Sequence, residues 1–261
     1  KGGLAFLAAY NDLVFDMHAN DTARAFFKRN IAARVDDPSL TEPVVPSTPI
    51  GCKRLCVDTH YYEIYNQAHV SLVDLNETPI TRIEGNAILT GTIRCEVDAI
   101  VLATGFDAMT GAVMNIDIRG KNGLSLQDKW ATGPKAYLGL ATAGFPNLFL
   151  VTGPGSPSVL SNMLPSIEQH VEWIASCIEF MDRHQHRSID PDRDAEEAWI
   201  EHVNEVADTS VYPGCNSWYL GANVEGKSRV FMPYLGVPPY VEKCNEVVAA
   251  GYAGFKLSGT S

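Results

Sequence analysis

Two nearly continuous apolar runs, each ending at a glycine, constrain the fold of this chain more than any other feature. The first covers residues 97–103 and ends at Gly105, and the second covers residues 148–152 and ends in the Gly-Pro-Gly turn at 153–155. Such runs are typical of strands buried on both faces, as in a parallel sheet. Residues 165–183 follow with apolar side chains at helical spacing. Strand, glycine-rich turn and helix in this order predict an α/β fold in which helix amides face a ligand.

Shorter elements are expected around these runs. Because Ile167, Val171, Ile174, Ile178 and Met181 step by three or four residues, we expect them to form the inward face of the long helix. The other patterns predict a helix over 22–35 capped near Asn20, an irregular proline-rich connector over 36–51, a strand over 70–75, paired strands over 79–83 and 87–89, a helix over 195–207, long loops over 212–239, a helix over 243–250 and a strand over 255–257.

Composition excludes several classes of protein. The chain carries 31 acidic and 20 basic residues, a net charge of −11, which argues against nucleic acid as a partner because phosphate binding needs clustered cations. No apolar run approaches the roughly 20 residues that a membrane span requires. The first residues carry one positive charge but neither a signal peptide nor an initiator methionine, so we expect the chain to begin inside a longer protein.

The cysteines and histidines suggest neither a disulfide scaffold nor a metal site. Three residues separate Cys52 from Cys56, a spacing that fits neither a CxxC redox motif nor a zinc half-site. We therefore expect a reducing, cytoplasmic location. The histidines do not converge: His170 and His202 are expected at polar edges of helices, and no HExxH spacing exists, so no metal is assigned. A GxSxG nucleophile elbow is also missing.

Three features remain as candidate sites, each with an ordinary alternative. The turn at 153–158 lacks both the Walker lysine and the third glycine of a dinucleotide fingerprint, so it is either a tight turn or a backbone held close to a flat ligand. Lys53-Arg54 is either a solvated basic turn or an anion site, since a guanidinium stays charged and can donate two hydrogen bonds at once. Trp218, in a loop rich in Gly and Asn, either packs or stacks on a ligand.

Eight segments together resemble the Baeyer–Villiger monooxygenases, and most closely the phenylacetone and steroid monooxygenase branch. The resemblance covers essentially the whole chain, in order and at plausible spacing. The segments are CKRL at 52–55, DTHYYEIYN at 58–66, VDAIVLATGFD at 97–107, DIRGKNG at 117–123, YLGLATAGFP at 137–146, GPGSPSVLSNM at 153–163, SIEQHVEW at 166–173 and SWYLGANVEGK at 217–227.

The resemblance implies a flavoprotein with two dinucleotide-binding domains, of which this chain is the C-terminal part. Residues 1–95 resemble the second half of an NADP-binding domain with the proline-rich connector, and residues 96–261 resemble the C-terminal part of an FAD-binding domain with a loop that closes over NADP. The glycine-rich fingerprints for FAD and NADP and the FxGxxxHxxxW signature are absent. A missing N-terminal segment is therefore required for activity, either earlier in a longer chain or on another chain. A monomer is expected.

The activity implied by the resemblance is oxygen insertion into a ketone to give an ester or lactone, with O2, FAD and NADPH, through a C4a-peroxyflavin. Arg54 matches the catalytic arginine of the family and also contacts the cofactor. Lys53 matches the residue that faces the NADP 2′-phosphate, Met163 a contact to the flavin ring, and Trp218 the loop tryptophan over NADP. The substrate pocket is expected to be bordered by Ser158, Val159 and Leu160.

Two alternatives remain open. One is a flavin-dependent monooxygenase that oxygenates nitrogen or sulfur and shares the ATG strand. The other is a non-catalytic α/β remnant that binds no cofactor. A thioredoxin-reductase-like activity is disfavoured because no CxxC motif exists.

Overall fold

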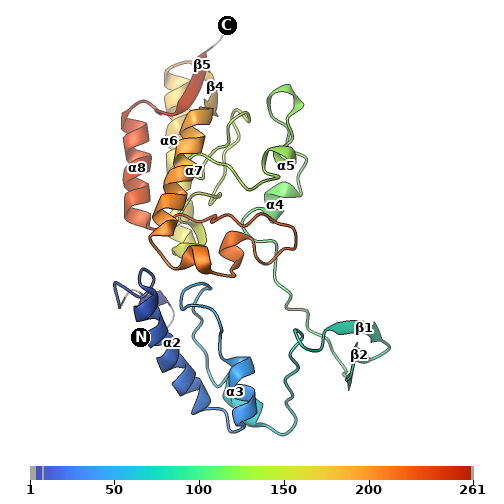
Figure 1. Ribbon diagram of the computed structural model, residues 1–261. Helices are drawn as coiled ribbons and strands as arrows, with labels where there is room; N and C mark the ends of the chain where they lie inside the picture. Colours follow the sequence, from blue (N-terminus) through green and yellow to red (C-terminus); the bar gives the residue numbers. More distant parts are fainter. Residues whose placement is uncertain (1–3, 8, 260–261) are drawn as a thin grey trace. The chain divides into compact units, whose positions relative to one another are not determined.

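The computed structural model describes residues 4–7 and 9–259, and the chain divides into two units (Figure 1). The first unit contains Lys1–Leu13, Met17–Ile50 and Leu55–Gly105. The second contains Phe106–Ser261 together with two short earlier segments, Val14–Asp16 and Gly51–Arg54. Lys53 and Arg54 are therefore part of the second unit. The expectation about the first residues of the chain falls on residues 1–3, outside the described residues.

The first unit combines short helices with a small antiparallel sheet. Its helices are α1 (Leu4–Leu7), α2 (Met17–Ala32), α3 (Pro38–Val44) and the 3-10 turn η1 (Glu63–Asn66). Its sheet has the order β1 (Ile80–Glu84), β2 (Ala87–Thr90) and β3 (Arg94–Glu96). Glu84 pairs with Ala87, which confirms the hairpin predicted around Gly85 and Asn86.

Two expectations for the first unit are wrong: Asn20 does not cap a helix, and the connector over 36–51 is not irregular throughout. Asn20 lies inside α2 and is fully buried; its amide donates to the carbonyl oxygens of Leu13 (2.8 Å) and Ile50 (2.9 Å), so it joins two loops and caps nothing. The connector over 36–51 contains α3, whose first turn accommodates Pro38 because that position needs no amide bond. The side chain of Asp37 caps this helix at the Ser39 amide, 2.9 Å away.

The apolar run at 97–103 is not a strand. Val101 is 88% exposed and Leu102 is 77% exposed. The Val97 amide donates to the Asn86 carbonyl at 2.9 Å, but no strand of the described chain pairs with residues 98–103. A strand needs a neighbouring backbone to accept and donate its hydrogen bonds, and an apolar sequence alone does not supply one. The strand predicted over 70–75 is likewise irregular. Within the described residues both sheets are antiparallel, so the expected parallel strand pair is not observed.

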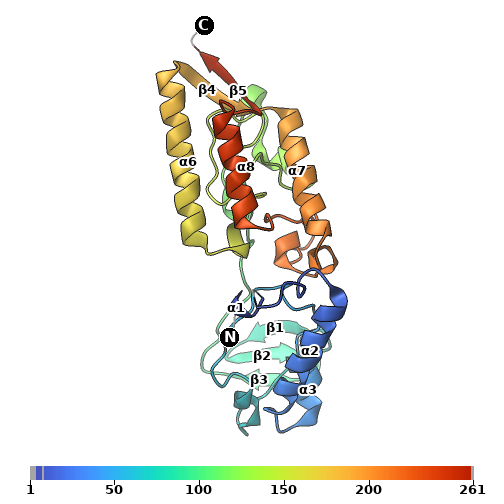
Figure 2. The same cartoon turned by 90° about the vertical axis from the view of Figure 1, so that its left-hand side faces the viewer.

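The second unit is built around three long helices that run alongside one another, with a two-stranded ribbon at one end (Figure 2). Helices predicted over 165–183, 195–207 and 243–250 are confirmed with longer bounds, as is the terminal strand, which pairs antiparallel with a strand not expected from the sequence. The elements are α4 (Gly111–Met114), η2 (Lys121–Gly123), α5 (Leu126–Lys129), η3 (Ser158–Leu160), α6 (Met163–Arg183), β4 (His186–Pro191), α7 (Arg193–Asp208), η4 (Tyr212–Gly214), η5 (Trp218–Leu220), α8 (Val237–Ala249) and β5 (Phe255–Gly259).

The buried face of α6 differs from the expected one. The side chains that face the core are Ser166, His170, Trp173, Cys177 and Met181, whereas Val171 and Ile178 are exposed. The residues of both faces repeat at helical spacing, but the predicted face contains more apolar residues than the face that is buried. Polar residues occupy the true face because hydrogen-bond partners inside the unit satisfy them. The second apolar run, 148–152, contributes only an isolated antiparallel bridge between Phe149 and Ala141.

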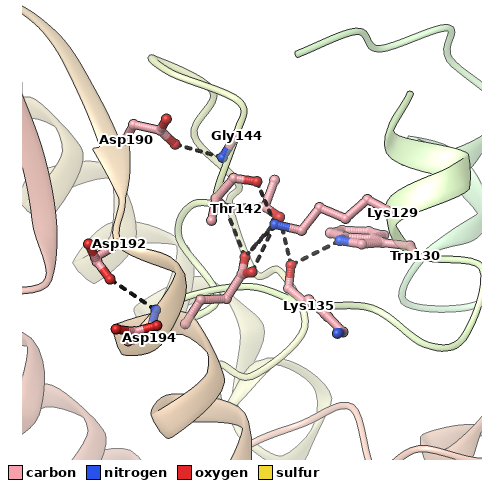
Figure 3. A network of polar contacts seen from close by, with 10 residues as sticks. Lys129, Trp130, Lys135, Thr142, Gly144, Asp190, Asp192 and Asp194 are labelled. Atoms are coloured by element: carbon pink, nitrogen blue, oxygen red, sulfur yellow. Dashed lines mark hydrogen bonds and ion pairs between the residues drawn. The ribbon is translucent and has the colours of Figure 1, made fainter. Parts of the chain in front are cut away.

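A buried ion pair joins α5 to α7. The Lys129 amine lies 2.8 Å from the Glu196 carboxylate, which also accepts from the Thr142 hydroxyl (3.0 Å) and the Ala143 amide (2.8 Å). Figure 3 shows Lys129 and Thr142 directed at this carboxylate. Burial lowers the pKa of Lys129, and the hydrogen bond to Glu196 opposes that shift. The pair holds the loop around residue 142 against α7.

No helix in the described part of the chain has the length and apolar character needed to cross a bilayer.

Replacing Glu196 with Gln should destabilise the second unit by about 3–5 kcal/mol, because the Lys129 charge then stays buried without its counter-charge. Urea unfolding followed by tryptophan fluorescence measures this loss. Glu197→Gln, at the exposed neighbouring position, is the control and should change stability by less than about 0.5 kcal/mol. Equal stability of the two variants would show that the pair contributes nothing.

Candidate functional site

The glycine-rich turn at 153–155 brings two backbone segments of the second unit into close contact. A Cβ atom on Gly153 would lie 2.5 Å from the Gly139 carbonyl oxygen, and one on Gly155 would lie 3.0 Å from the Trp199 indole nitrogen. The same indole nitrogen donates to the Gly155 carbonyl at 3.1 Å. Close packing inside the unit therefore accounts for glycine at positions 153 and 155. This favours a tight turn over a backbone held close to a flat ligand.

A buried histidine holds the residue that enters this turn. Thr152 has a left-handed backbone (φ 57°), and its amide donates to Nδ1 of His170 at 2.8 Å. Nε2 of His170 lies 3.0 Å from the Tyr240 hydroxyl, which itself donates to the Leu138 carbonyl at 2.8 Å. Because the single hydroxyl proton goes to Leu138, the imidazole carries its proton on Nε2 and donates to Tyr240.

The placement of His170 corrects the expectation of a polar helix edge, since its side chain is fully buried. His202 is exposed, as expected, and contacts the Tyr234 hydroxyl at 3.0 Å. The missed signal at His170 is its spacing from Trp173 and Cys177, which shares the true inward face of α6. Among the residues that the structure describes, no cluster of three His, Cys, Asp or Glu side chains is placed to hold a metal ion.

Arg54 lies beside the turn that follows the glycines. Its Nη1 atom donates to the Val159 carbonyl at 3.0 Å, which joins two residues 105 positions apart. Burial raises the pKa of the Tyr219 phenol, and the positive charge of Arg54 opposes that rise. The structure thus brings Arg54 and Val159 together, and Lys53 is exposed on the same segment.

The residues expected at the substrate pocket and flavin ring form one continuous stretch. Ser158 is buried in η3, whereas Val159 and Leu160 are partly buried and pack against the core. The Asn162 side chain caps α6 by accepting from the Leu164 amide at 3.2 Å, and Met163 begins this helix half-exposed. These residues therefore lie on both sides of Val159, whose carbonyl accepts the Arg54 hydrogen bond.

Trp218 sits in η5, a single turn whose start and end are both fixed. The Ser217 hydroxyl accepts from the Tyr219 amide at 3.2 Å, and Gly221 ends the turn in a left-handed conformation. The Trp218 ring packs edge-on against Tyr219, with centroids 4.4 Å apart, and stays half-exposed. Part of the indole is therefore available to a ligand.

A disulfide between Cys52 and Cys215 joins the Lys53-Arg54 segment to the loop that leads into Trp218. Spacing along the sequence could not identify this pair, because 163 residues separate the two cysteines. The cysteine that pairs with Cys52 is therefore Cys215, and not its neighbour in sequence, Cys56. The two Cα atoms are 5.5 Å apart, within the usual range for a disulfide.

The environment of His170 makes the stability of the second unit pH-dependent. Burial lowers the pKa of His170 to about 4, below its value of about 6.5 in an unfolded chain. Between these values the unfolded chain binds the proton more readily, so the stability that is present above pH 6.5 falls by about 3 kcal/mol as the pH drops to 4. Urea midpoints measured from pH 7.5 to 4.5 should show this slope.

His170→Gln should flatten that slope, because the titrating group is gone, and should lower the stability at pH 7.5. His202→Gln, at the exposed histidine, should keep the slope of the unsubstituted protein. An unchanged slope in His170→Gln would assign the pH dependence to other groups.

Comparisons with known proteins show extensive similarity over one part of larger enzymes. No family model matches the chain. It is 39% identical to cyclopentanone 1,2-monooxygenase of Comamonas sp. (strain NCIMB 9872), over 98% of this chain and 48% of that protein. It is 38% identical to acetone monooxygenase (methyl acetate-forming) of Gordonia sp. (strain TY-5), over 97% and 48%. Phenazine N-monooxygenase PhzNO1 of Lysobacter antibioticus is 39% identical over 98% and 47%.

Solved structures give the same result. A steroid monooxygenase bound to NADP matches with a TM-score of 0.88 and 46% identity, over 97% of this chain and 48% of its own. A cyclohexanone monooxygenase from Rhodococcus sp. Phi1 bound to NADP+ matches with a TM-score of 0.91 and 37% identity, over 96% and 47%. The chain spans about half the length of the curated relatives it matches, and the matching part is their C-terminal half.

Proposed function

The chain is a homologue of the C-terminal half of the Baeyer–Villiger monooxygenases, and we propose that the protein containing it inserts one oxygen atom of O2 into a ketone to give an ester or lactone. The proposal includes FAD and NADPH as cofactors. The observation that carries it is the position of Arg54, whose guanidinium is anchored on the Val159 carbonyl.

Arg54 would hold negative charge as it develops during oxygen transfer. The contact to the Val159 carbonyl positions the guanidinium, and a guanidinium can bind an anion through two N–H donors at once. When bound, FAD supplies the electrons taken from NADPH and the activation of O2. A preorganised donor of this kind lowers the barrier by roughly 3–4 kcal/mol.

Lys53 and Trp218 fit the two ends of a nicotinamide dinucleotide. Lys53 is exposed and offers a point charge, which suits the 2′-phosphate that distinguishes NADP from NAD. Trp218 presents part of a flat indole from a turn fixed by Ser217 and Gly221. A ring over the dinucleotide would exclude water and so protect a reactive oxygen species from hydrolysis.

The stretch 158–163 would border both ketone and flavin. Val159 carries the carbonyl that anchors Arg54, so its side chain and that of Leu160 lie near the charge that oxygen transfer requires. Both are partly buried and apolar, which suits an uncharged ketone. Met163, half-exposed at the start of α6, is proposed to contact the flavin ring.

The rest of the protein would supply what this chain lacks. The pyrophosphates of FAD and NADP need glycine-rich turns at helix N-termini, and neither fingerprint is present in these 261 residues. We infer that the missing half carries both and covers the exposed apolar run at 97–103 with neighbouring strands. A monomeric state and a cytoplasmic location stay predictions.

Oxygenation of a ring nitrogen is the second candidate function, favoured by the 39% identity to a phenazine N-monooxygenase. Incubating the full-length protein with cyclic ketones and with phenazines, each with NADPH, separates the two activities. A non-catalytic remnant would be colourless when purified with its missing segment, whereas a flavoprotein would be yellow.

Arg54→Ala in the full-length protein should lower ester formation by about 100- to 1000-fold, because the anchored positive charge is lost. Flavin reduction by NADPH should be retained in part, since that step needs no cation at this position. Product formation and anaerobic flavin bleaching measure the two steps. Arg119→Ala, at an exposed arginine paired with Asp117, should change neither. Normal ester formation by Arg54→Ala would refute the catalytic role.

Lys53→Ala should weaken the preference for NADPH over NADH, because the 2′-phosphate loses its counter-charge while the rest of the dinucleotide is unaffected. The ratio of kcat/KM for the two coenzymes should fall by about tenfold, the effect of losing one exposed charge contact to phosphate. Lys243→Ala, at an exposed lysine of α8, is the control for a general loss of positive charge. An unaltered ratio in Lys53→Ala would remove the phosphate assignment.

A further inference from the structure

We propose that Cys52 and Cys215 form a redox modification site that fastens the Arg54 segment while oxidised and releases it when a dithiol reduces the bond. The inference deepens the proposed function and rests on it for its consequence, because the fastened segment carries the residues assigned to oxygen transfer and coenzyme binding. The disulfide itself stands on the structure alone.

The position of the bond sets it apart from an ordinary structural crosslink. Gly51–Arg54 is a four-residue piece of the second unit, and the residues on either side, Ile50 and Leu55, belong to the first unit. Gly51 and Cys52 are buried, whereas Lys53 and Arg54 are exposed. A covalent bond at Cys52 and a hydrogen bond from Arg54 to the Val159 carbonyl both attach the piece to the second unit. Breaking the covalent one should therefore loosen the segment.

The same bond also holds the turn that carries Trp218. Cys215 lies directly after η4 and three residues before Trp218. It packs in the core cluster with Tyr212 and Tyr219, and Tyr219 is the neighbour of Trp218 in η5. One covalent link thus fixes the spacing between the basic segment and the indole. A change in its redox state would act on both sides of the proposed coenzyme site.

The surroundings accommodate the reduced state as well. The Cys215 sulfur lies 3.3 Å from the Val211 carbonyl oxygen, so a thiol formed there has an acceptor in place. Cys52 is 0% exposed and Cys215 is 7% exposed, so a reductant reaches the Cys215 side first. A buried bond of this kind exchanges slowly unless the segment moves.

The chemical step is a thiol–disulfide exchange. A thiolate of an external dithiol attacks the Cys215 sulfur, the bond between the two cysteine sulfurs breaks, and the Cys52 thiolate leaves and takes a proton. The second thiol of the reductant then attacks the mixed disulfide and releases Cys215. Two electrons and two protons pass to the protein, and the dithiol becomes a disulfide.

The experiment uses the full-length protein, with and without dithiothreitol as the dithiol. Peptide mapping under non-reducing conditions should show the Cys52 and Cys215 peptides linked before treatment and separate after it. Limited trypsin digestion then reports on the segment, because Lys53 and Arg54 are both trypsin sites. We expect cleavage at these two residues to be about tenfold faster after reduction, as for a segment released from a folded unit.

Variants separate the bond from other effects of the reductant. Cys52→Ser/Cys215→Ser should be cleaved at the fast rate with or without dithiothreitol, whereas Cys95→Ser, at an exposed cysteine of β3, should behave like the unsubstituted protein. If the double variant does not fold, the cleavage rates of the unsubstituted protein with and without dithiothreitol still test whether the bond holds the segment.

Two results would overturn the proposal: unlinked Cys52 and Cys215 peptides in the untreated protein, or equal cleavage at Lys53-Arg54 in both redox states. Ketone oxygenation is assayed separately. Redox-dependent cleavage without any oxygenation would leave the redox site standing and refute the proposed function instead.

Discussion

The hydrogen bond from the Thr152 amide to the buried imidazole of His170 is the interaction on which the second unit depends most. It holds a β-branched residue in the left-handed conformation, which such residues rarely adopt without a compensating contact. The imidazole can accept this bond only while it is neutral, and its full burial keeps it neutral. The Tyr240 hydroxyl fixes the tautomer by accepting from the opposite nitrogen.

From this point the geometry of the candidate site follows along the chain. The turn at 153–155 fits only because glycines let it approach Gly139 and Trp199. The next turn then places the Val159 carbonyl where Arg54 can donate to it. A cation that arrives from a distant segment is thus oriented by an acceptor that the turn presents. Specific packing and satisfied polar groups, more than any recognisable phosphate loop, build this site.

Helices were easier to predict than strands, for a physical reason. Helices α6, α7 and α8 make their backbone hydrogen bonds locally, so the spacing of apolar residues was enough to find them. The run at 97–103 has the composition of a buried strand, but a strand is defined by the neighbour that pairs with it, and beyond Val97 no strand among the described residues pairs with this run. The inward face of α6 differs from the predicted one because the burial of His170 depends on distant partners at Thr152 and Tyr240.

The long helices, the hairpin at Gly85 and the family resemblance can be predicted from the amino-acid order alone, because each rests on residues close together in the chain or on ordered motifs. The amino-acid order also supplied Arg54, Lys53 and Trp218 as candidates. Three contacts require the folded structure: Arg54 with Val159, Cys52 with Cys215, and the buried imidazole of His170 with the Thr152 amide. These three contacts join residues 105, 163 and 18 positions apart. Local pattern carries no information about which distant groups meet, because that depends on how the helices pack.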